Sequence, residues 1–376
     1  MILIDGRVVT PQLSGIGRYT LNLLHGIDAV GATLGADRIG VWVRPDAPLP
    51  REIQNSPALD LIEKPGAPRD AGHLIGSRRE LRRLGATLFH CPDVFAPLRC
   101  PCPRLVTVHD VIPLVCPGML PRSRKQKYRR LWRVWARSQA RGAAGVVTVS
   151  AYSARDIGRE LGVARERIHV IPNAAASYKT ERSDALDIDG PFILYVGRRD
   201  PYKNVEGLVR AFALLLDGQE KLAPDLQLLV VGSPDPRYPE AEDTARKLGV
   251  ASRVLFTGHV PDATLQAMYT KASVLAAPSF YEGFGLPALE AMRAGTPVVA
   301  ADAAALPEVV GDAGLLFDPR SDEALAAALH RVLTEPGLAE RLGDKGRRHA
   351  GSYSIPDVGR RHLGLYDRIL APQAGL

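Results

Sequence analysis

No hydrophobic run in this chain of 376 residues approaches the roughly 18 apolar residues that a membrane-spanning helix needs. Met1 leads directly into the apolar stretch ILID, without the basic and apolar segments of a secretory leader. Disorder is also not indicated, because hydrophobic residues make up 46% of the chain and the mean hydropathy is −0.05. We therefore expect a cytoplasmic globular protein, long enough for two domains.

Cysteine is scarce. The four cysteines fall within 26 residues, as Cys91, Cys100, Cys102 and Cys116, but no pair has the C-x-x-C spacing of a zinc site. His109 is the one histidine between the outer two cysteines. Reduced thiols are the ordinary state in a cytosolic protein, so we predict free cysteines and no metal site, with zinc as the alternative.

Acidic residues are scarce in the first part of the chain. Residues 1–175 contain 26 Lys and Arg against 14 Asp and Glu, whereas the remaining residues contain 22 against 27. This excess of basic residues could bind a nucleic acid. However, aromatic residues amount to 6% of the chain and no compact RNA or DNA motif is present, so we expect no nucleic-acid partner and keep a basic nucleic-acid-binding protein as the alternative class.

Much of the basic excess lies in residues 122–141, which contain nine Lys and Arg and no acid. Tyr128, Leu131, Trp132 and Trp135 recur there at helical spacing, which predicts one basic helix with an aromatic stripe. Such a helix is typical of a contact with an anionic membrane or another polyanion. The alternative is that the stripe packs inward while the arginines are solvated.

Short apolar strands alternate with helical stretches in both parts of the chain, which predicts an α/β protein with helix-covered parallel sheets. A polar run that ends at Gly190 breaks the alternation. We therefore predict an N-terminal domain over residues 1–175, a linker over 176–190 and a C-terminal domain over 191–352. Residues 353–376 predict a final helix that caps one domain or crosses between the two.

Two acids stand close together in the second part of the chain, in the stretch YEGFGLPALEAM. Glu282 and Glu290 flank a turn made of Gly283, Phe284, Gly285, Leu286 and Pro287. The turn follows the apolar stretch VLAAPS, so it is expected at the carboxyl end of a parallel strand, where ligands bind in such sheets. A helix is predicted from Ala288 to Ala294, with Gly295 as its stop and Glu290 in its first turn, where an acid complements the helix dipole.

Cations stand at a second turn of this part, in the stretch YVGRRDPYKN. Arg198, Arg199 and Lys203 follow a predicted strand and precede a helix that is expected to begin near Asn204. Basic side chains beside a helix N-terminus form an anion site, which suits a diphosphate. A carboxylate such as Glu290 accepts two hydroxyl hydrogens from a ribose. The two turns together predict a site for a nucleoside diphosphate joined to a polyhydroxylated group.

These two stretches together resemble the donor site of the retaining glycosyltransferases of family 4. The motifs SGIGRYT, VHDVIPL, VTVSAYSARDI, IHVIPN and AALPEVVGDAGLLFDP also follow in the order of that family, so the resemblance covers nearly the whole chain. It implies the GT-B fold, in which two Rossmann-like domains hold the donor in the cleft between them. It also implies metal-independent catalysis, without a cofactor.

The resemblance assigns roles to four side chains of the second part. Arg198 and Lys203 would hold the diphosphate and stabilise its charge as it leaves. Glu290 would bind the ribose, and Glu282 would contact the hexose hydroxyls. Beside these acids, the residues that would approach the donor are Gly283, Phe284, Gly285 and Leu286.

The first part of the chain would complete the site. Gly15 and Gly17 would lie in a loop that closes over the diphosphate, and His109 would hold a hydroxyl of the reacting sugar while its carbonyl faces the anomeric carbon. The alternative of a dinucleotide fingerprint is disfavoured, because the third glycine is missing and the pair follows its strand by about ten residues. His109 at a strand end with only local bonds is a further alternative.

The opening DGR and SGIGRY resembles bacterial mannosyltransferases that build lipid-linked polysaccharides such as lipopolysaccharide. The resemblance thus implies hexose transfer, with mannose from GDP-mannose as the donor and a saccharide or lipid-linked acceptor. It also implies a peripheral position at the inner face of the membrane. A UDP-sugar or rhamnosyl transferase of the same fold, and a sugar-phosphate isomerase or epimerase of similar fold, are the alternatives.

Overall fold

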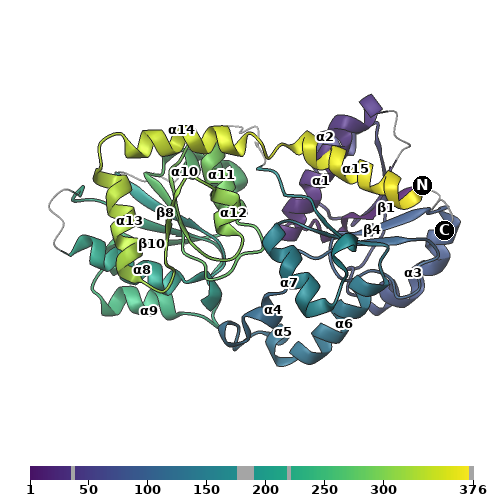
Figure 1. The fold of residues 1–376 in the computed structure, drawn as a ribbon, viewed down its shortest axis with the longest axis horizontal. Helices are drawn as coiled ribbons and strands as arrows, with labels where there is room; N and C mark the ends of the chain where they lie inside the picture. Colours follow the sequence, from purple (N-terminus) through teal and green to yellow (C-terminus); the bar gives the residue numbers. More distant parts are fainter. Residues whose placement is uncertain (35–38, 176–189, 218–221, 372–376) are drawn as a thin grey trace. The chain divides into compact units, whose positions relative to one another are not determined.

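The computed structural model describes residues 1–34, 39–175, 190–217 and 222–371. Within these ranges the chain forms two compact units (Figure 1). Unit 1 contains Met1–Leu114, Tyr128–Ala174 and the part from Tyr353 onward, and unit 2 contains Val115–Lys127 and the part from Ala175 to Ser352. The predicted linker lies outside the described residues, apart from Gly190.

Unit 1 is built on one parallel sheet in the strand order β3-β2-β1-β4-β5-β6-β7. The strands are β1 (Ile2–Asp5), β2 (Ile39–Val43), β3 (Leu59–Glu63), β4 (Leu88–Cys91), β5 (Arg104–Thr107), β6 (Gly145–Thr148) and β7 (Ile168–Val170). Its helices are α1 (Gly15–Leu34), α2 (Arg51–Gln54), α3 (Ala71–Arg83), α6 (Arg129–Gly142), α7 (Ala151–Leu161) and α15 (Ile355–Leu370), with α4 (Ile112–Val115) ending one residue beyond its boundary. Every residue of β2, β4 and β6 is buried, as expected for strands that helices cover on both faces.

The C-terminal helix α15 belongs to unit 1 and packs along α1. Gly26 of α1 and Gly359 of α15 face each other so closely that a Cβ on either would overlap the backbone of the other. The helix also places Leu363 and Tyr366 in the apolar core under the sheet. The last helix of the chain thus completes the fold of the first domain's sheet.

Unit 2 repeats the plan with a parallel sheet in the order β10-β9-β8-β11-β12-β13. The strands are β8 (Phe192–Val196), β9 (Gln227–Val231), β10 (Val254–Gly258), β11 (Val274–Ala277), β12 (Val298–Ala301) and β13 (Leu315–Phe317). The helices are α5 (Arg124–Lys127), α8 (Val205–Leu216), α9 (Glu240–Lys247), α10 (Asp262–Lys271), α11 (Leu286–Ala294), α12 (Leu306–Val310), α13 (Asp322–Thr334) and α14 (Leu338–Ala350). The two helix-flanked parallel sheets confirm the predicted fold class.

The prediction of one helix over residues 122–141 is wrong. The segment forms α5 and α6, and the chain breaks between them at Tyr128, which has φ −107° and ψ 30°. Lys127 and Arg130 carry like charges and would be neighbours on a continuous helix across this break, which weakens such a helix. Among the described residues, no helix is both long and apolar enough to cross a membrane.

The aromatic stripe packs inward only in part. Trp135 packs inward, where its indole Nε1 donates to the carbonyl of Val94 at 2.9 Å and its ring stacks on Phe95. Leu131 and Val134 point to solvent instead, with 69% and 67% of their surface exposed. The outward side of α6 is therefore both basic and apolar.

Candidate active site

The two turns of unit 2 follow neighbouring strands. β8 pairs with β9 on one side and with β11 on the other, so the strand order reverses direction beside β8. In open α/β sheets the carboxyl ends of the strands at such a switch point form the ligand-binding crevice. The turn after β8 carries Arg198 and Lys203, and the turn after β11 carries Glu282. A backbone bond from Phe280 N to Tyr202 O, 2.8 Å long, joins the two turns.

Lys203 and Glu282 form an ion pair at this edge of the sheet. Nζ of Lys203 lies 2.5 Å from Oε1 of Glu282, and both side chains are about 15% exposed. Ser279 donates its hydroxyl to the same carboxylate oxygen at 2.8 Å. A mostly buried cation and acid held together at the carboxyl edge of the sheet can bind an anion and neighbouring hydroxyls at the same time.

The two arginines of the first turn have different surroundings. Arg198 is 65% exposed and binds Asp200, with Nε 2.8 Å from Oδ2. Arg199 is buried, pairs with Glu242 and lies over the Phe256 ring, 4.7 Å from its centroid. Arg198 can therefore reach a ligand, while Arg199 serves the packing of the unit.

Strained backbone fixes the positions of both turns. Asn204, directly before α8, has φ 55°, which is uncommon for a residue other than glycine. Its amide Nδ2 bonds the carbonyl of Pro319 at 3.2 Å, which helps to hold it there. Gly285, directly before α11, has φ 106°, and a Cβ there would also press on Leu306. Gly283 and Phe284 are buried beside it.

Glu290 lies in the second turn of α11, not in its first turn as the sequence suggested, because the helix begins at Leu286. The side chain is 7% exposed, and Tyr269 donates its hydroxyl to Oε2 at 2.8 Å. Tyr269 comes from α10 and had no signal in the sequence. Glu290 therefore lies too far from the helix N-terminus to interact strongly with the helix dipole. Its carboxylate is oriented by the hydrogen bond from Tyr269 instead.

His109 of unit 1 follows the carboxyl end of β5. A carbonyl can only accept a hydrogen bond, so Nε2 of His109 donates to Pro92 O at 3.0 Å, which sets the tautomer. The ring meets the edge of Tyr19, with centroids 4.7 Å apart.

A buried hydrogen-bond network lies next to His109 and was not predicted from the sequence. The Tyr19 hydroxyl lies 2.9 Å from Nε2 of His362 and 3.3 Å from Oγ1 of Thr107, while His90 bonds Thr107 at 2.9 Å. Burial lowers the pKa of His362 to about 4, so this ring is neutral at pH 7. Helix α15 thereby supports the ring on which His109 rests.

Gly15 and Gly17 lie in the first turn of α1, so the expectation that they form a loop is wrong. The Ser14 hydroxyl accepts a bond from Gly17 N at 3.2 Å, which favours helix at this point. A Cβ at Gly17 would press on Leu13 and on the carbonyl of Val8, whereas one at Gly15 would meet open space. Gly17 is therefore needed for packing, and Gly15 leaves the helix start accessible.

None of the four cysteines forms a disulfide; Cys91 is buried, and the sulfurs of Cys100 and Cys102 lie 3.6 Å apart. Within the described ranges, no group of three or more His, Cys, Asp and Glu side chains could hold a metal ion.

Comparisons with known proteins identify the family of the chain. A family model described as Glycosyltransferase Family 4 matches residues 13–175, and one described as Glycosyl transferases group 1 matches residues 179–349. The chain is 30% identical over 363 residues to the O-antigen chain mannosyltransferase B of Escherichia coli, with 91% of this chain and 93% of the relative covered. The MMP alpha-(1->4)-mannosyltransferase of Mycolicibacterium hassiacum is 34% identical over 236 residues, which cover 62% of this chain and 56% of the relative.

Solved structures share the fold. The sucrose-phosphate synthase of Thermosynechococcus elongatus superposes with a TM-score of 0.77 at 24% identity, covering 98% of this chain and 99% of that one. The Anabaena protein Alr3699/HepE in complex with UDP-glucose gives a TM-score of 0.73 at 18% identity, with 98% and 99% covered. The chain belongs to the family 4 glycosyltransferases, with the GT-B fold, and is an enzyme that transfers a glycosyl group.

Proposed function

We propose that the enzyme transfers a hexose with retention, namely mannose from GDP-mannose, to a lipid-linked or growing polysaccharide acceptor. The observation that carries the reaction type is the pairing of Lys203 with Glu282 at the switch point of unit 2. The long match to an O-antigen mannosyltransferase supports the sugar and the class of acceptor. A UDP-sugar is the second candidate, because the Anabaena neighbour holds UDP-glucose.

In this mechanism the bond between the anomeric carbon and the diphosphate breaks first, leaving an oxocarbenium-like sugar. Lys203 and Arg198 stabilise the charge on the departing diphosphate. Glu282 accepts bonds from the hexose hydroxyls and Glu290 from the ribose. The acceptor hydroxyl attacks the face that the diphosphate has left and passes its proton to a phosphate oxygen.

Two further residues orient the reactants. His109 holds a sugar hydroxyl near the reacting carbon, and its tautomer is set by the bond to Pro92. Gly15 leaves the start of α1 open, so that backbone N–H groups can approach the diphosphate. The chain's own cations suffice for the leaving group, so the reaction needs no divalent metal.

A donor screen tests the proposal. GDP-mannose, UDP-glucose, UDP-galactose and dTDP-rhamnose are each compared for thermal stabilisation and for release of the nucleoside diphosphate. We expect GDP-mannose to give the largest shift, because a ligand stabilises the native state with the logarithm of its concentration. A larger shift and faster release with a UDP-sugar would replace the donor assignment, and no release from any donor would contradict the reaction.

We also propose that the outward side of α6 binds an anionic membrane at the inner face, where a lipid-linked acceptor lies. Leu131 and Val134 are exposed there among arginines. Each cation close to an anionic leaflet contributes roughly 1 kcal/mol. Arg130→Gln with Arg137→Gln should lower co-sedimentation with anionic vesicles and leave donor hydrolysis intact.

The matched control for this experiment is Arg82→Gln with Arg83→Gln, which removes the same charge from the exposed end of α3. Equal loss of binding in both double variants would show a general charge effect and would contradict a specific surface on α6. Binding that survives high salt unchanged would also contradict it.

A further inference from the structure

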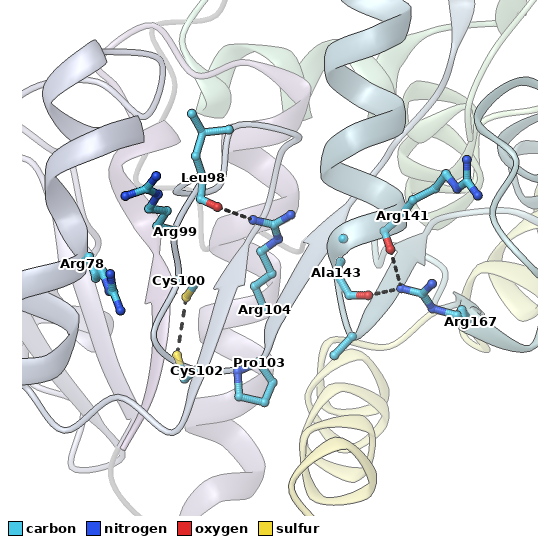
Figure 2. A pocket seen from close by; sticks show the side chains of 12 residues that line it. Arg78, Leu98, Arg99, Cys100, Cys102, Pro103, Arg104, Arg141, Ala143 and Arg167 are labelled. Carbon is cyan, nitrogen blue, oxygen red and sulfur yellow. Dashed lines mark hydrogen bonds between the residues drawn. The ribbon is translucent and has the colours of Figure 1, made fainter.

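A pocket of about 850 Å³ lies in unit 1, apart from the residues assigned to catalysis (Figure 2). Five arginines and two cysteines are among the side chains that line it, and no acid is. The arginines are Arg78, Arg99, Arg104, Arg141 and Arg167. In the part of the chain that the structure describes, none of these five forms an ion pair with a carboxylate. Such a concentration of uncompensated positive charge favours an anionic ligand.

The pocket lies at the opposite edge of the sheet from His109. Arg104 is the first residue of β5, and Gly142 and Arg167 closely precede β6 and β7, so parallel strands bring them to the amino edge. His109 follows the carboxyl end of β5, five residues from Arg104, about 16 Å along the strand direction. A ligand in the pocket therefore does not occupy the sugar position at His109.

Two of the guanidinium groups are held in place by backbone carbonyls. Arg104 donates from Nη1 to Pro97 O at 2.9 Å. Arg167 donates from Nη2 to Arg141 O at 3.1 Å (Figure 2). The Nε of Arg104 is buried and has no hydrogen-bond partner. Such a buried donor is costly unless a ligand satisfies it.

The backbone of Gly142 makes room for this arrangement. A Cβ at this position would overlap Nη2 of Arg104, so a larger residue at position 142 would displace the end of this arginine. The arginine is oriented by its surroundings on two sides and is not a freely moving surface charge. Preorganised donors of this kind lower the entropy that binding costs.

We propose that this pocket binds a small anion with two or more neighbouring phosphate groups, outside the catalytic crevice. One phosphate group accepts bidentate hydrogen bonds from about two arginines, so five arginines are more than a single phosphate needs. The phosphates can come from a soluble polyphosphorylated molecule or from the phosphorylated headgroup of a membrane lipid. Arg141 is the last cation of α6, so the pocket adjoins the side of α6 that we propose to bind the membrane. This position is compatible with a lipid headgroup as the ligand.

The thiol pair supplies a reporter inside the pocket. The sulfurs of Cys100 and Cys102 lie 3.6 Å apart, and a hydrogen bond from Cys102 lowers the pKa of Cys100 to about 7. Cys100 should therefore react readily with iodoacetamide at neutral pH. A bound anion would shield this thiol and raise its pKa, and so slow the reaction. Cys116 lies outside the pocket and is an internal reference.

The experiment measures alkylation of Cys100 relative to Cys116 by mass spectrometry in the full chain. One arm adds inorganic tripolyphosphate, and the other adds vesicles with or without phosphatidylinositol bisphosphate. The chain carries Lys203→Gln throughout, which weakens binding of the probe at the donor site. Protection of Cys100 by either probe supports the proposed site and shows whether its ligand is a soluble phosphate or a lipid headgroup. If neither probe protects Cys100, the proposal is overturned.

Variants tie protection to the arginines. Arg104→Gln and Arg167→Gln should each raise the half-protecting concentration roughly tenfold, the loss expected for one hydrogen-bonded charge. Gly142→Ala keeps every charge and displaces Arg104, so it should weaken protection similarly. The control Arg82→Gln should leave protection unchanged.

If Arg104→Gln fails to fold, Arg78→Gln with Arg141→Gln, both exposed, takes its place. Equal protection in the pocket variants and the control would overturn the proposal. An oligonucleotide that protects Cys100 far more tightly than tripolyphosphate would also overturn it, in favour of a nucleic-acid surface.

Discussion

Replacement of Lys203 tests the charge pair on which the proposed chemistry depends. Nζ of Lys203 lies 2.5 Å from Glu282, and only 15% of the lysine side chain is exposed, so solvent screens this cation weakly. Removing one preorganised charge that faces a developing anion costs about 2.7–4 kcal/mol. Lys203→Ala should therefore lower kcat by roughly 10²- to 10³-fold.

The pair adds a second expectation. In Lys203→Ala the carboxylate of Glu282 remains mostly buried and loses its cation. This unpaired negative charge then repels the diphosphate of the donor. Lys203→Ala with Glu282→Gln should thus lose about tenfold less than the product of the two single losses, a coupling near 1.4 kcal/mol.

The assay is the steady-state release of the nucleoside diphosphate, measured for the parent, both single variants and the double variant. Lys247→Ala, an exposed lysine on α9, is the control and should match the parent. The reasoning is refuted if Lys203→Ala keeps more than a tenth of the parent kcat. Independent, multiplicative losses in the double variant would refute the coupling.

Three other predictions concern the metal, the ribose ligand and the buried histidine. Turnover should persist in EDTA, and a loss that only magnesium or manganese restores would contradict metal independence. Glu290→Gln should weaken donor binding roughly tenfold in a titration, because charged hydrogen bonds to the ribose are lost, and unchanged affinity would contradict that role. Because the pKa of His362 falls from 6.5 to about 4 on folding, its neutral form stabilises the protein above pH 6.5, and up to roughly 3 kcal/mol is lost as the pH falls toward 4. Denaturant unfolding should show this loss, and His362→Gln should flatten it.

The sequence allowed much of the fold to be predicted, because buried parallel strands such as β2 and β12 are apolar throughout. The edge strands β3 and β13 have weak signals in the sequence, since LDLIE carries two acids and LLF has only three residues. The motif DGR has a structural role that its sequence does not indicate. Asp5 and Arg7 form a buried ion pair 2.7 Å long, which the sequence cannot distinguish from a solvated one.

For the site, the sequence identified the turns but not their partners. Lys203 and Glu282 were recognised separately, and their contact depends on β8 and β11 being neighbours, which strand order alone decides. Tyr269 reaches Glu290 from another helix, and His362 reaches Tyr19 across 343 residues. Such contacts arise from tertiary packing, for which local spacing carries no signal.

The configuration of the first-formed product tests the central claim most directly. The enzyme is incubated with GDP-α-mannose, and the sugar that appears, free or transferred, is followed by proton NMR before mutarotation is complete. The account predicts GDP release together with an α-configured mannosyl product. A β-configured first product, or no release of GDP under conditions where the protein is folded, would contradict it.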